Sequence, residues 1–188
     1  MNKKNLFLVI ALFFSTVAFS QASLSAGLFA GAIVPFQKDI VIDKAPIEAG
    51  ISANLNVLKH FVGIQGVYLN YSATTVNENN IEEAFDAQYV GAGLTYSYRY
   101  LKLPVFYMGV GATARYYKKI EGASTFENPS DEISPTVLNY GLSPSIGISV
   151  PFIEVELRPE LYFRDSFSEN FDASFDFLPT IELRYKFF

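Results

Sequence analysis

The chain contains no cysteine, no tryptophan and a single histidine, His60, among 188 residues. Without cysteine the protein forms no disulfide bond, no thiolate metal site and no lipid anchor on a cysteine thiol. One histidine is also too few for the donor sets that transition metals prefer in proteins. We therefore expect neither a metal site nor a cofactor.

Basic residues are scarce as well, since 14 lysines and arginines stand against 19 aspartates and glutamates. Lys3 and Lys4 are the only charged residues in 1–20, so removal of this segment takes the formal charge from −5 to −7. Nucleic-acid binding requires clustered Lys and Arg, and this balance excludes nucleic acid as a partner.

The first twenty residues, MNKKNLFLVIALFFSTVAFS, place two lysines before an apolar run from Leu6 to Phe14. This arrangement is typical of a secretory signal peptide, and the run is too short for a comfortable membrane-spanning helix. We predict a cleaved signal peptide at 1–20 and one domain at 21–188. No run of 18 apolar residues follows, so no transmembrane helix is expected in that domain.

Half of the residues are hydrophobic, and in eight stretches they alternate with small or polar residues. A period of two is the pattern of a β-strand with two chemically different faces. The predicted strands are 23–34, 47–57, 61–72, 87–100, 103–117, 137–150, 153–164 and 177–188. The alternation in 61–72 is the least regular, and its faces are not assigned.

The connections between these strands alternate between long and short. The long ones are 35–46, 73–86, 118–136 and 165–176, and the short ones are 58–60, 101–102 and 151–152. Up-and-down strands then have every long loop at one end, as outer-membrane barrels do, and an even strand number lets the sheet close. The sequence predicts an all-β fold, an eight-stranded antiparallel up-and-down transmembrane β-barrel.

A soluble ligand-carrying barrel also alternates, but it turns its polar face to water. Here much of the polar face is Gly, Ser, Asn and Thr, which suits the narrow lumen of an eight-stranded barrel. The opposite phase of 153–164 would place two arginines and three glutamates in lipid. Each arginine would cost about 2–4 kcal/mol at the midplane, so the membrane barrel is favoured and the soluble barrel is the alternative.

The acidic and basic residues on the polar face of the strands are nearly balanced in number. A buried charge without a partner is costly, so a lumen that holds these residues requires mutual ion pairs. The predicted lumen charge network consists of Glu48, Arg99, Arg115, Glu154, Glu156, Arg158, Glu160, Arg164, Glu182 and Arg184. The glutamates could also be interpreted as paired catalytic carboxylates, but their interleaving with arginines favours a structural network.

Three aromatic and glycine-rich stretches carry a family resemblance: YVGAGLTYSYRY, YMGVGATARYY and the ending LRYKFF. With the signal peptide and the eight strands, they resemble the small outer-membrane β-barrel proteins of Gram-negative bacteria, the OmpA/OmpX-like class. The stretches AFSQ and RYKFF resemble members from Bacteroidetes most. The resemblance implies that the barrel-assembly machinery reads the aromatic last strand. Tyr185, Phe187 and Phe188 are therefore the predicted assembly signal, with the apolar phase running through Phe187.

Two further features bear on this barrel: its single histidine, as a candidate catalytic residue, and two prolines within its strands. Lipid-modifying outer-membrane barrels use, by resemblance, a histidine near the outer leaflet, whereas His60 lies in a short turn at the other end. We therefore predict that the protein is not an enzyme. Pro144 and Pro159 face each other if Val150 pairs with Ile153, and proline donates no ladder hydrogen bond. We predict a bulge or a register slip at these prolines.

The long loops contain 14 acidic residues against four lysines. An acidic solvated surface is favoured over a Ca²⁺ or Mg²⁺ site. Phe167, Phe171 and Phe175 fall in the last loop and are candidate contact residues, because exposed aromatics often mark binding surfaces.

These observations predict an exported outer-membrane protein with a plugged lumen, acidic extracellular loops and a structural or adhesion role. The alternative is a narrow porin-like channel for small solutes. The expected partners are outer-membrane lipid and lipopolysaccharide, the barrel-assembly machinery, and an extracellular protein or surface of unknown identity.

Overall fold

The structure is a computed structural model that describes residues 22–35, 40–76, 82–124, 133–164 and 175–187. The predicted signal peptide lies outside these residues. The strands are β1 (Ala22–Ala32), β2 (Val34–Pro35), β3 (Ile40–Val57), β4 (His60–Val76), β5 (Glu82–Lys102), β6 (Phe106–Ser124), β7 (Thr136–Ser149), β8 (Ile153–Arg164) and β9 (Phe175–Lys186). In the described part of the chain, no helix has the length and hydrophobicity needed to cross a membrane.

The strands form one antiparallel sheet that closes on itself, because β1 pairs with β3 on one side and with β9 on the other. β2 continues the line of β1 along β9. Between them, the N–H of Ile33 donates to the carbonyl oxygen of Pro46 at 2.9 Å. β1 and β2 are therefore one interrupted wall strand, and the predicted eight-stranded up-and-down barrel is confirmed.

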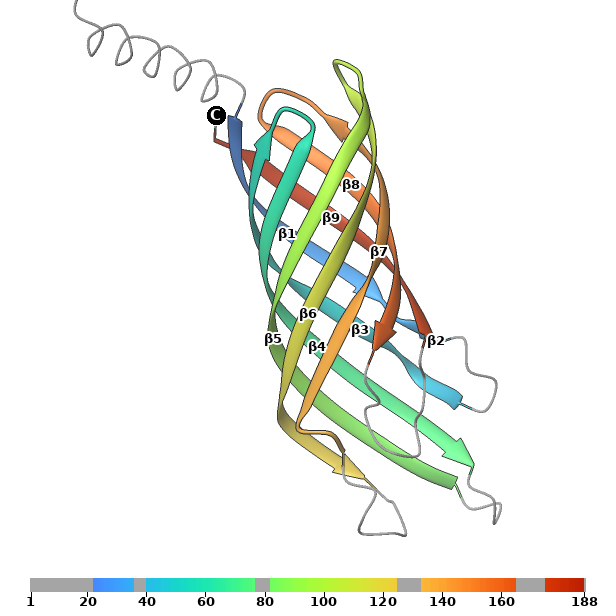
Figure 1. The fold of residues 1–188 in the computed structure, drawn as a ribbon. Coiled ribbons are helices and arrows are strands. Elements are labelled where there is room, and N and C mark those ends of the chain that lie inside the picture. The colour runs from blue at the N-terminus through green and yellow to red at the C-terminus, as the bar shows by residue number, and fades with distance from the viewer. Residues whose placement is uncertain (1–21, 36–39, 77–81, 125–132, 165–174, 188) are drawn as a thin grey trace, which may run out of the picture.

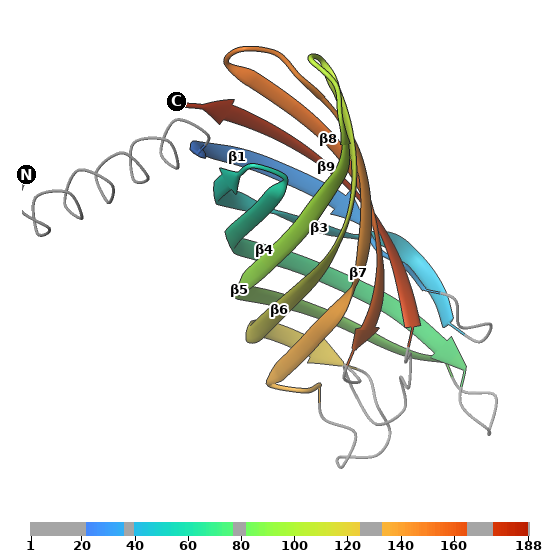
Figure 2. The same cartoon turned by 45° about the horizontal axis from the view of Figure 1, so that its top comes forward.

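Figure 1 shows the three short turns and the ends of β1 and β9 at the same end of the barrel. The strand ends that flank the longer connections lie at the other end, as the loop lengths predict. β4, β5 and β6 have 17, 21 and 19 residues, whereas β8 and β9 have 12 each. In Figures 1 and 2 the three longer strands reach further at the long-loop end.

The outward face of the wall carries an apolar belt. On β5 the outward residues are apolar or aromatic from Val90 to Tyr100, a stretch of ten residue steps. At about 3.3 Å per step and a tilt of roughly 40°, this stretch spans about 25 Å, the height of the apolar band of outer-membrane barrels. Tyr96, Tyr98 and Tyr185 lie at the short-turn edge of the belt.

The strands at the long-loop end are longer than the sequence predicted. Residues 40–46, 73–76, 82–86, 118–124 and 175–176 belong to strands rather than to loops. The β4–β5 ladder, for example, runs in one register from His60 paired with Tyr98 to Val76 paired with Glu82. Backbone pairing does not depend on hydrophobic side chains, and Thr and Val favour strands, so the ladder continues beyond the apolar belt.

One short turn was placed two residues too early. β5 continues through Lys102, which pairs with Tyr107, and the turn is Leu103–Val105 instead of 101–102. Pro104 restricts the backbone and has no N–H, which explains why the reversal falls around it. The turn at 151–152 is confirmed, since the N–H of Val150 donates to Ile153 O at 2.9 Å.

A row of three outward prolines crosses β7, β8 and β9. Pro159 lies opposite Pro179, and the register on both sides of the gap places Pro144 opposite Pro159. Pairing between 143–145 and 158–160 is absent, yet it resumes in the same register. The predicted opposition is confirmed, but the predicted bulge or slip is wrong. Because proline has no N–H, the ladder loses hydrogen bonds here without any residue being inserted.

Candidate functional site: the lumen

The inward face of the barrel wall places charged and aromatic side chains inside a narrow lumen. Every second residue of each strand points inward, so the strand pairing decides which of these side chains meet. Nine members of the predicted charge network have described side chains, and all nine are buried. We call these nine the charged layer: Glu48, Arg99, Arg115, Glu154, Glu156, Arg158, Glu160, Glu182 and Arg184.

One part of the charged layer, the long-loop part, lies toward the long loops and centres on Arg115 of β6. Its guanidinium group contacts Glu48 at 2.9 Å and Glu160 at 3.0 Å. Glu160 also accepts a hydrogen bond from Arg158 Nε at 2.8 Å. Arg115 and Arg158 therefore share one carboxylate, which links β3, β6 and β8 across the lumen.

The other part of the charged layer, the short-turn part, lies toward the short turns and centres on Arg184 of β9. Arg184 contacts Glu154 and lies 2.8 Å from Glu156 and 2.7 Å from Glu182. Arg158 contacts both Glu156, at 3.2 Å, and Glu182, at 3.0 Å. The ion pairs therefore form one continuous network from the long-loop part to the short-turn part.

Arg99 is the last member of the network at the short-turn end. Its Nη2 atom donates to Glu154 at 2.6 Å and its Nη1 atom donates to the same carboxylate at 3.1 Å. This two-point geometry is the strongest form of an arginine–carboxylate pair. The tenth predicted member, Arg164, pairs through its backbone with Asn139, and its side chain lies outside the described residues.

Three tyrosines of the network were missed in the sequence. Tyr107 donates to Glu156 at 2.7 Å, Tyr117 donates to Glu48, and Tyr162 donates to Glu160. The signal was available, because each tyrosine lies two residues from a position already assigned to the polar phase. Their aromatic rings led to their omission from that phase.

Arginine side chains in the charged layer also stack on aromatic rings. The guanidinium carbon of Arg99 lies 3.8 Å from the ring centre of Tyr107, and that of Arg184 lies 4.3 Å from Phe61. Gly147 makes room for this arrangement, since a Cβ there would lie 2.3 Å from the Tyr107 ring. Stacking of this kind stabilises a buried guanidinium group beyond its ion pairs.

A second group of inward side chains fills the lumen closer to the long loops. We call it the apolar layer: Phe29, Ile33, Val67, Leu69, Tyr71, Ala87, Tyr89, Tyr117, Ile133, Val137, Tyr162 and Leu178. It begins where the hydroxyl groups of Tyr117 and Tyr162 donate hydrogen bonds to the carboxylates of the charged layer. The sequence did not predict this layer, and three of its members, Val67, Leu69 and Tyr71, lie in 61–72, whose faces were unassigned.

The outward face changes its chemistry at the level of the apolar layer. Along β4 it passes from Tyr68 to Asn70, and along β6 it passes from Tyr116 to Lys118. Beyond the apolar belt these two strands turn mainly polar residues outward, with exposed Ile120 as an exception, while apolar residues gather inside. Within the belt the order is reversed, with charge inside and hydrocarbon outside.

The remaining predicted residues belong to the assembly signal and to the last loop. Tyr185 and Phe187 point outward, and their rings meet edge to face with centres 5.3 Å apart. Phe188, Phe167 and Phe171 lie outside the described residues. The backbone of Phe175 belongs to β9 and pairs with Phe163, so its assignment to a loop was wrong.

His60 is the first residue of β4, and its Nδ1 atom lies 2.9 Å from the Tyr96 hydroxyl. Both side chains are exposed at the short-turn end. Among the described residues no group of three His, Cys, Asp or Glu side chains has a geometry that would hold a metal ion.

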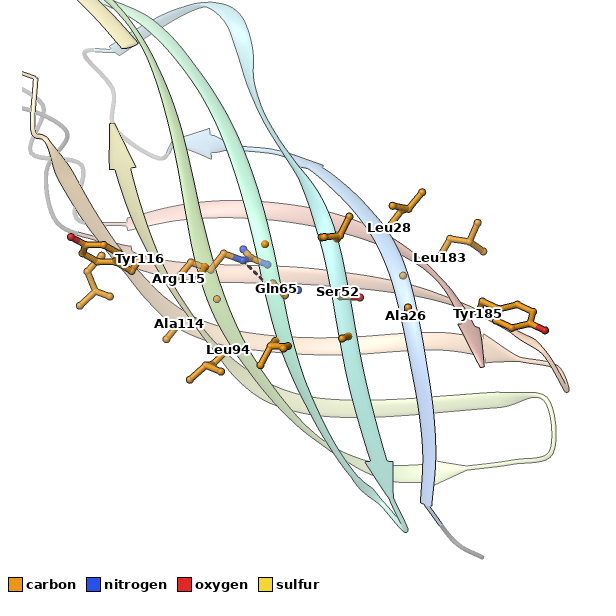
Figure 3. A pocket seen from close by; sticks show the side chains of 18 residues that line it. Ala26, Leu28, Ser52, Gln65, Leu94, Ala114, Arg115, Tyr116, Leu183 and Tyr185 are labelled. Atoms are coloured by element: carbon orange, nitrogen blue, oxygen red, sulfur yellow. Dashed lines mark hydrogen bonds between the residues drawn. The ribbon is translucent and has the colours of Figure 1, made fainter. Parts of the chain in front are cut away.

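Figure 3 shows the outward surface of β9, β1 and β3 to β6, where Leu28, Leu183 and Tyr185 point away from the wall. On the inner side, Arg115 Nε donates to Gln65 Oε1 at 2.9 Å. The outward surface is a shallow apolar depression with few polar atoms, and lipid chains are the solvent that suits it.

A closed antiparallel barrel of eight strands with an apolar belt defines the class of small outer-membrane barrels. Comparison with solved structures supports this fold. Neisserial surface protein A has 13% sequence identity and a TM-score of 0.59, over 88% of this chain and 99% of that protein. At this identity the likeness concerns the fold alone.

Two further structures of this class match with lower scores. The attachment invasion locus protein Ail of Yersinia pestis has 15% identity over 88% of this chain and 97% of its own, with a TM-score of 0.38. Outer membrane protein OprG of Pseudomonas aeruginosa has 12% identity over 89% of this chain and 96% of its own, with a TM-score of 0.43. No protein-family model and no curated protein sequence matches the chain.

Proposed function

We propose that this protein is a non-conducting outer-membrane barrel, without enzymatic activity, whose extracellular end serves a structural or adhesive role. The observation that carries the proposal is the filling of the lumen by two successive layers of side chains. Arg99, Arg115 and Arg184 are each at most 1% exposed, although they are among the longest side chains in the protein. An ion crossing the barrel would have to break several buried ion pairs and then pass the apolar layer.

The direct test is single-channel conductance of the mature protein refolded into a planar bilayer. We expect a silent membrane after insertion has been verified by protease protection of the barrel. Discrete openings whose amplitude changes in Glu156→Gln would instead show that ions pass the charged layer. That result would establish the narrow porin-like channel and contradict the non-conducting barrel.

The proposed location implies the remaining partners. The signal peptide at 1–20 directs export, and the apolar belt lies in outer-membrane lipid beside lipopolysaccharide. The acidic long-loop end faces outward, where an extracellular protein or surface binds.

Recognition by the assembly machinery is assigned to Tyr185, Phe187 and Phe188. Phe187→Ala removes an outward ring that contacts Tyr185, and we expect at least a severalfold drop in the amount of protein recovered in the outer membrane. The matched control is Phe152→Ala, which removes another outward, exposed ring from the turn after β7. Equal losses in both variants would contradict a specific assembly role for the last strand.

A further inference from the structure

A small polar cavity opens at the short-turn end of the lumen, next to the short-turn part of the charged layer. Its volume is about 180 Å³, and it lies between the ends of β1, β3, β5 and β9 and the turns after β5 and β7. Arg99, Lys102, Lys186 and Glu154 supply its charged lining. From the sequence, Lys186 was assigned to the polar face of the last strand and Lys102 to a short turn.

Lys102 and Lys186 bring two ammonium groups to this cavity. Lys186 Nζ donates to Ser149 Oγ at 2.8 Å, and Lys102 Nζ donates to the carbonyl oxygen of Leu58 at 3.4 Å. Within the described part of the chain, neither ammonium group forms an ion pair. An ammonium group has three donors, so each lysine retains donors for a ligand.

Arg99 adds a third cation to the lining. It is 1% exposed, and its two terminal nitrogens are taken by Glu154. Its Nε atom is buried and has no hydrogen-bond partner. A buried donor that forms no hydrogen bond is energetically costly, and a ligand oxygen in the cavity would supply the missing acceptor.

The charges around the cavity are not balanced by acidic residues. Glu154 is the single carboxylate of the described lining, and Arg99 and Arg184 already bind it. The neighbouring segments 55–62, 96–106 and 147–153 contain no acidic residue at all. A recess lined mainly by one sign of charge concentrates counter-ions, so this end of the barrel attracts anions.

We infer that this cavity binds a small oxyanion, namely the phosphate or carboxylate group of a molecule in the periplasm. The periplasmic location of this molecule rests on the proposed function, because the short turns of an outer-membrane barrel face the periplasm. The cavity is smaller than the roughly 300 Å³ of typical small-molecule pockets, so it accepts an anionic end group rather than a whole ligand. Its lining of ammonium, guanidinium and hydroxyl donors matches the acceptor oxygens of such a group.

The test is a titration of the ¹⁵N-labelled mature protein, refolded in zwitterionic detergent micelles, followed by amide chemical shifts. Sodium phosphate and sodium acetate are added in separate arms at constant ionic strength, and sodium chloride serves as the reference. We expect the amides of Lys102, Ser149 and Lys186 to shift saturably, and that of Lys118 to stay in place. The arm with the tighter binding shows whether phosphate or carboxylate is the preferred group.

Variants then connect the binding to the two lysines. We expect the double variant Lys102→Gln and Lys186→Gln to weaken binding at least about tenfold, which corresponds to the loss of two charge-assisted contacts. Lys118→Gln removes the same charge from the opposite end and is expected to change the affinity by less than about twofold. The two single variants, each expected to lose about threefold, keep the test open if the double variant does not fold.

Several outcomes would overturn the oxyanion site. These are the absence of any saturable shift, an equal shift with chloride, or unchanged binding in the double variant. A barrel that conducts ions but still shows the saturable shifts would overturn the proposed function and leave the site standing.

Discussion

The charged layer and the apolar layer are both built from the inward-facing residues of the wall, yet they fill the lumen in opposite ways. In the charged layer, five glutamates and four arginines pair within one network. In the apolar layer, Leu69, Tyr71 and Tyr89 have no exposed surface at all. The change coincides with the end of the outward apolar belt.

The difference shows that the inward chemistry follows the medium outside the wall. Inside the belt the outward face must be apolar for lipid, so the polar residues of each strand face the lumen and need partners there. Beyond the belt the wall meets water on its outside, and the hydrophobic effect again favours an apolar interior. Each layer therefore predicts a different response to substitution.

The largest effect is expected from the charged layer. Glu160→Leu removes the carboxylate that Arg115, Arg158 and Tyr162 share, and it leaves two buried guanidinium groups short of a partner. We expect a loss of about 3–5 kcal/mol in the free energy of unfolding, because breaking a buried pair strands its charge. Urea unfolding in detergent micelles, followed by far-UV circular dichroism, measures this loss.

Glu121→Gln is the matched control, since Glu121 is an exposed acidic residue near the end of β6. A surface change of this kind is expected to alter stability by less than about 0.5 kcal/mol. If Glu160→Leu were as mild as Glu121→Gln, the charged layer would contribute little to the stability of the barrel.

The apolar layer is expected to give a smaller but clear effect. Leu69→Ala opens a cavity beside Tyr71 and Tyr89, and we expect a loss of about 2–4 kcal/mol by the same unfolding measurement. Leu28→Ala, on the outward face at 65% exposure, serves as the control and is expected to lose much less. Equal losses would mean that the apolar layer is not packed as a core.

The smallest effect is expected at the boundary between the layers. Glu160 and Leu178 belong to different layers and are neighbours in sequence of Pro159 and Pro179, which lie in the row that interrupts the ladder. The double change Pro144→Val and Pro159→Val supplies two missing N–H donors. We expect a gain of about 1 kcal/mol for each hydrogen bond restored, visible as a higher urea midpoint.

Pro151→Ala, in the turn after β7, removes a proline without restoring a ladder bond and is expected to give no gain. A decrease in stability of the double variant would show that the gap between β7 and β8 is already compensated by other contacts. The two layers would then meet across a boundary that does not weaken the wall.

Much of the fold could be read from single strands. The alternation in 153–164 assigns Glu154 to one face and Val155 to the other whatever the neighbouring strands are, because side chains on a strand point to opposite sides in turn. The connection lengths then placed the long loops at one end and the short turns at the other. The sequence was less informative where alternation continued with other residue types, so the ends of β4, β5 and β6 were missed.

The partners of each lumen residue could not be read in this way. Arg115 meets Glu48 and Glu160 because β3, β6 and β8 face one another across the lumen, although they are not neighbours in the wall. The register between β8 and β9 also decided that Pro179 joins the two opposed prolines in one row. The pairing of the strands likewise brought Lys102 and Lys186, which are distant in sequence, to the same cavity.

The sequence by itself determined the strands, the two faces of all but one of them and the class of barrel, because these follow from a period of two and from loop lengths along one chain. The tertiary structure alone decided which charges pair, where the lumen changes from charged to apolar, and which cations gather at the short-turn mouth. The physical reason is that a closed sheet brings together residues from strands on opposite sides of the barrel. Those encounters depend on the register and tilt of the whole wall, which no single stretch of sequence contains.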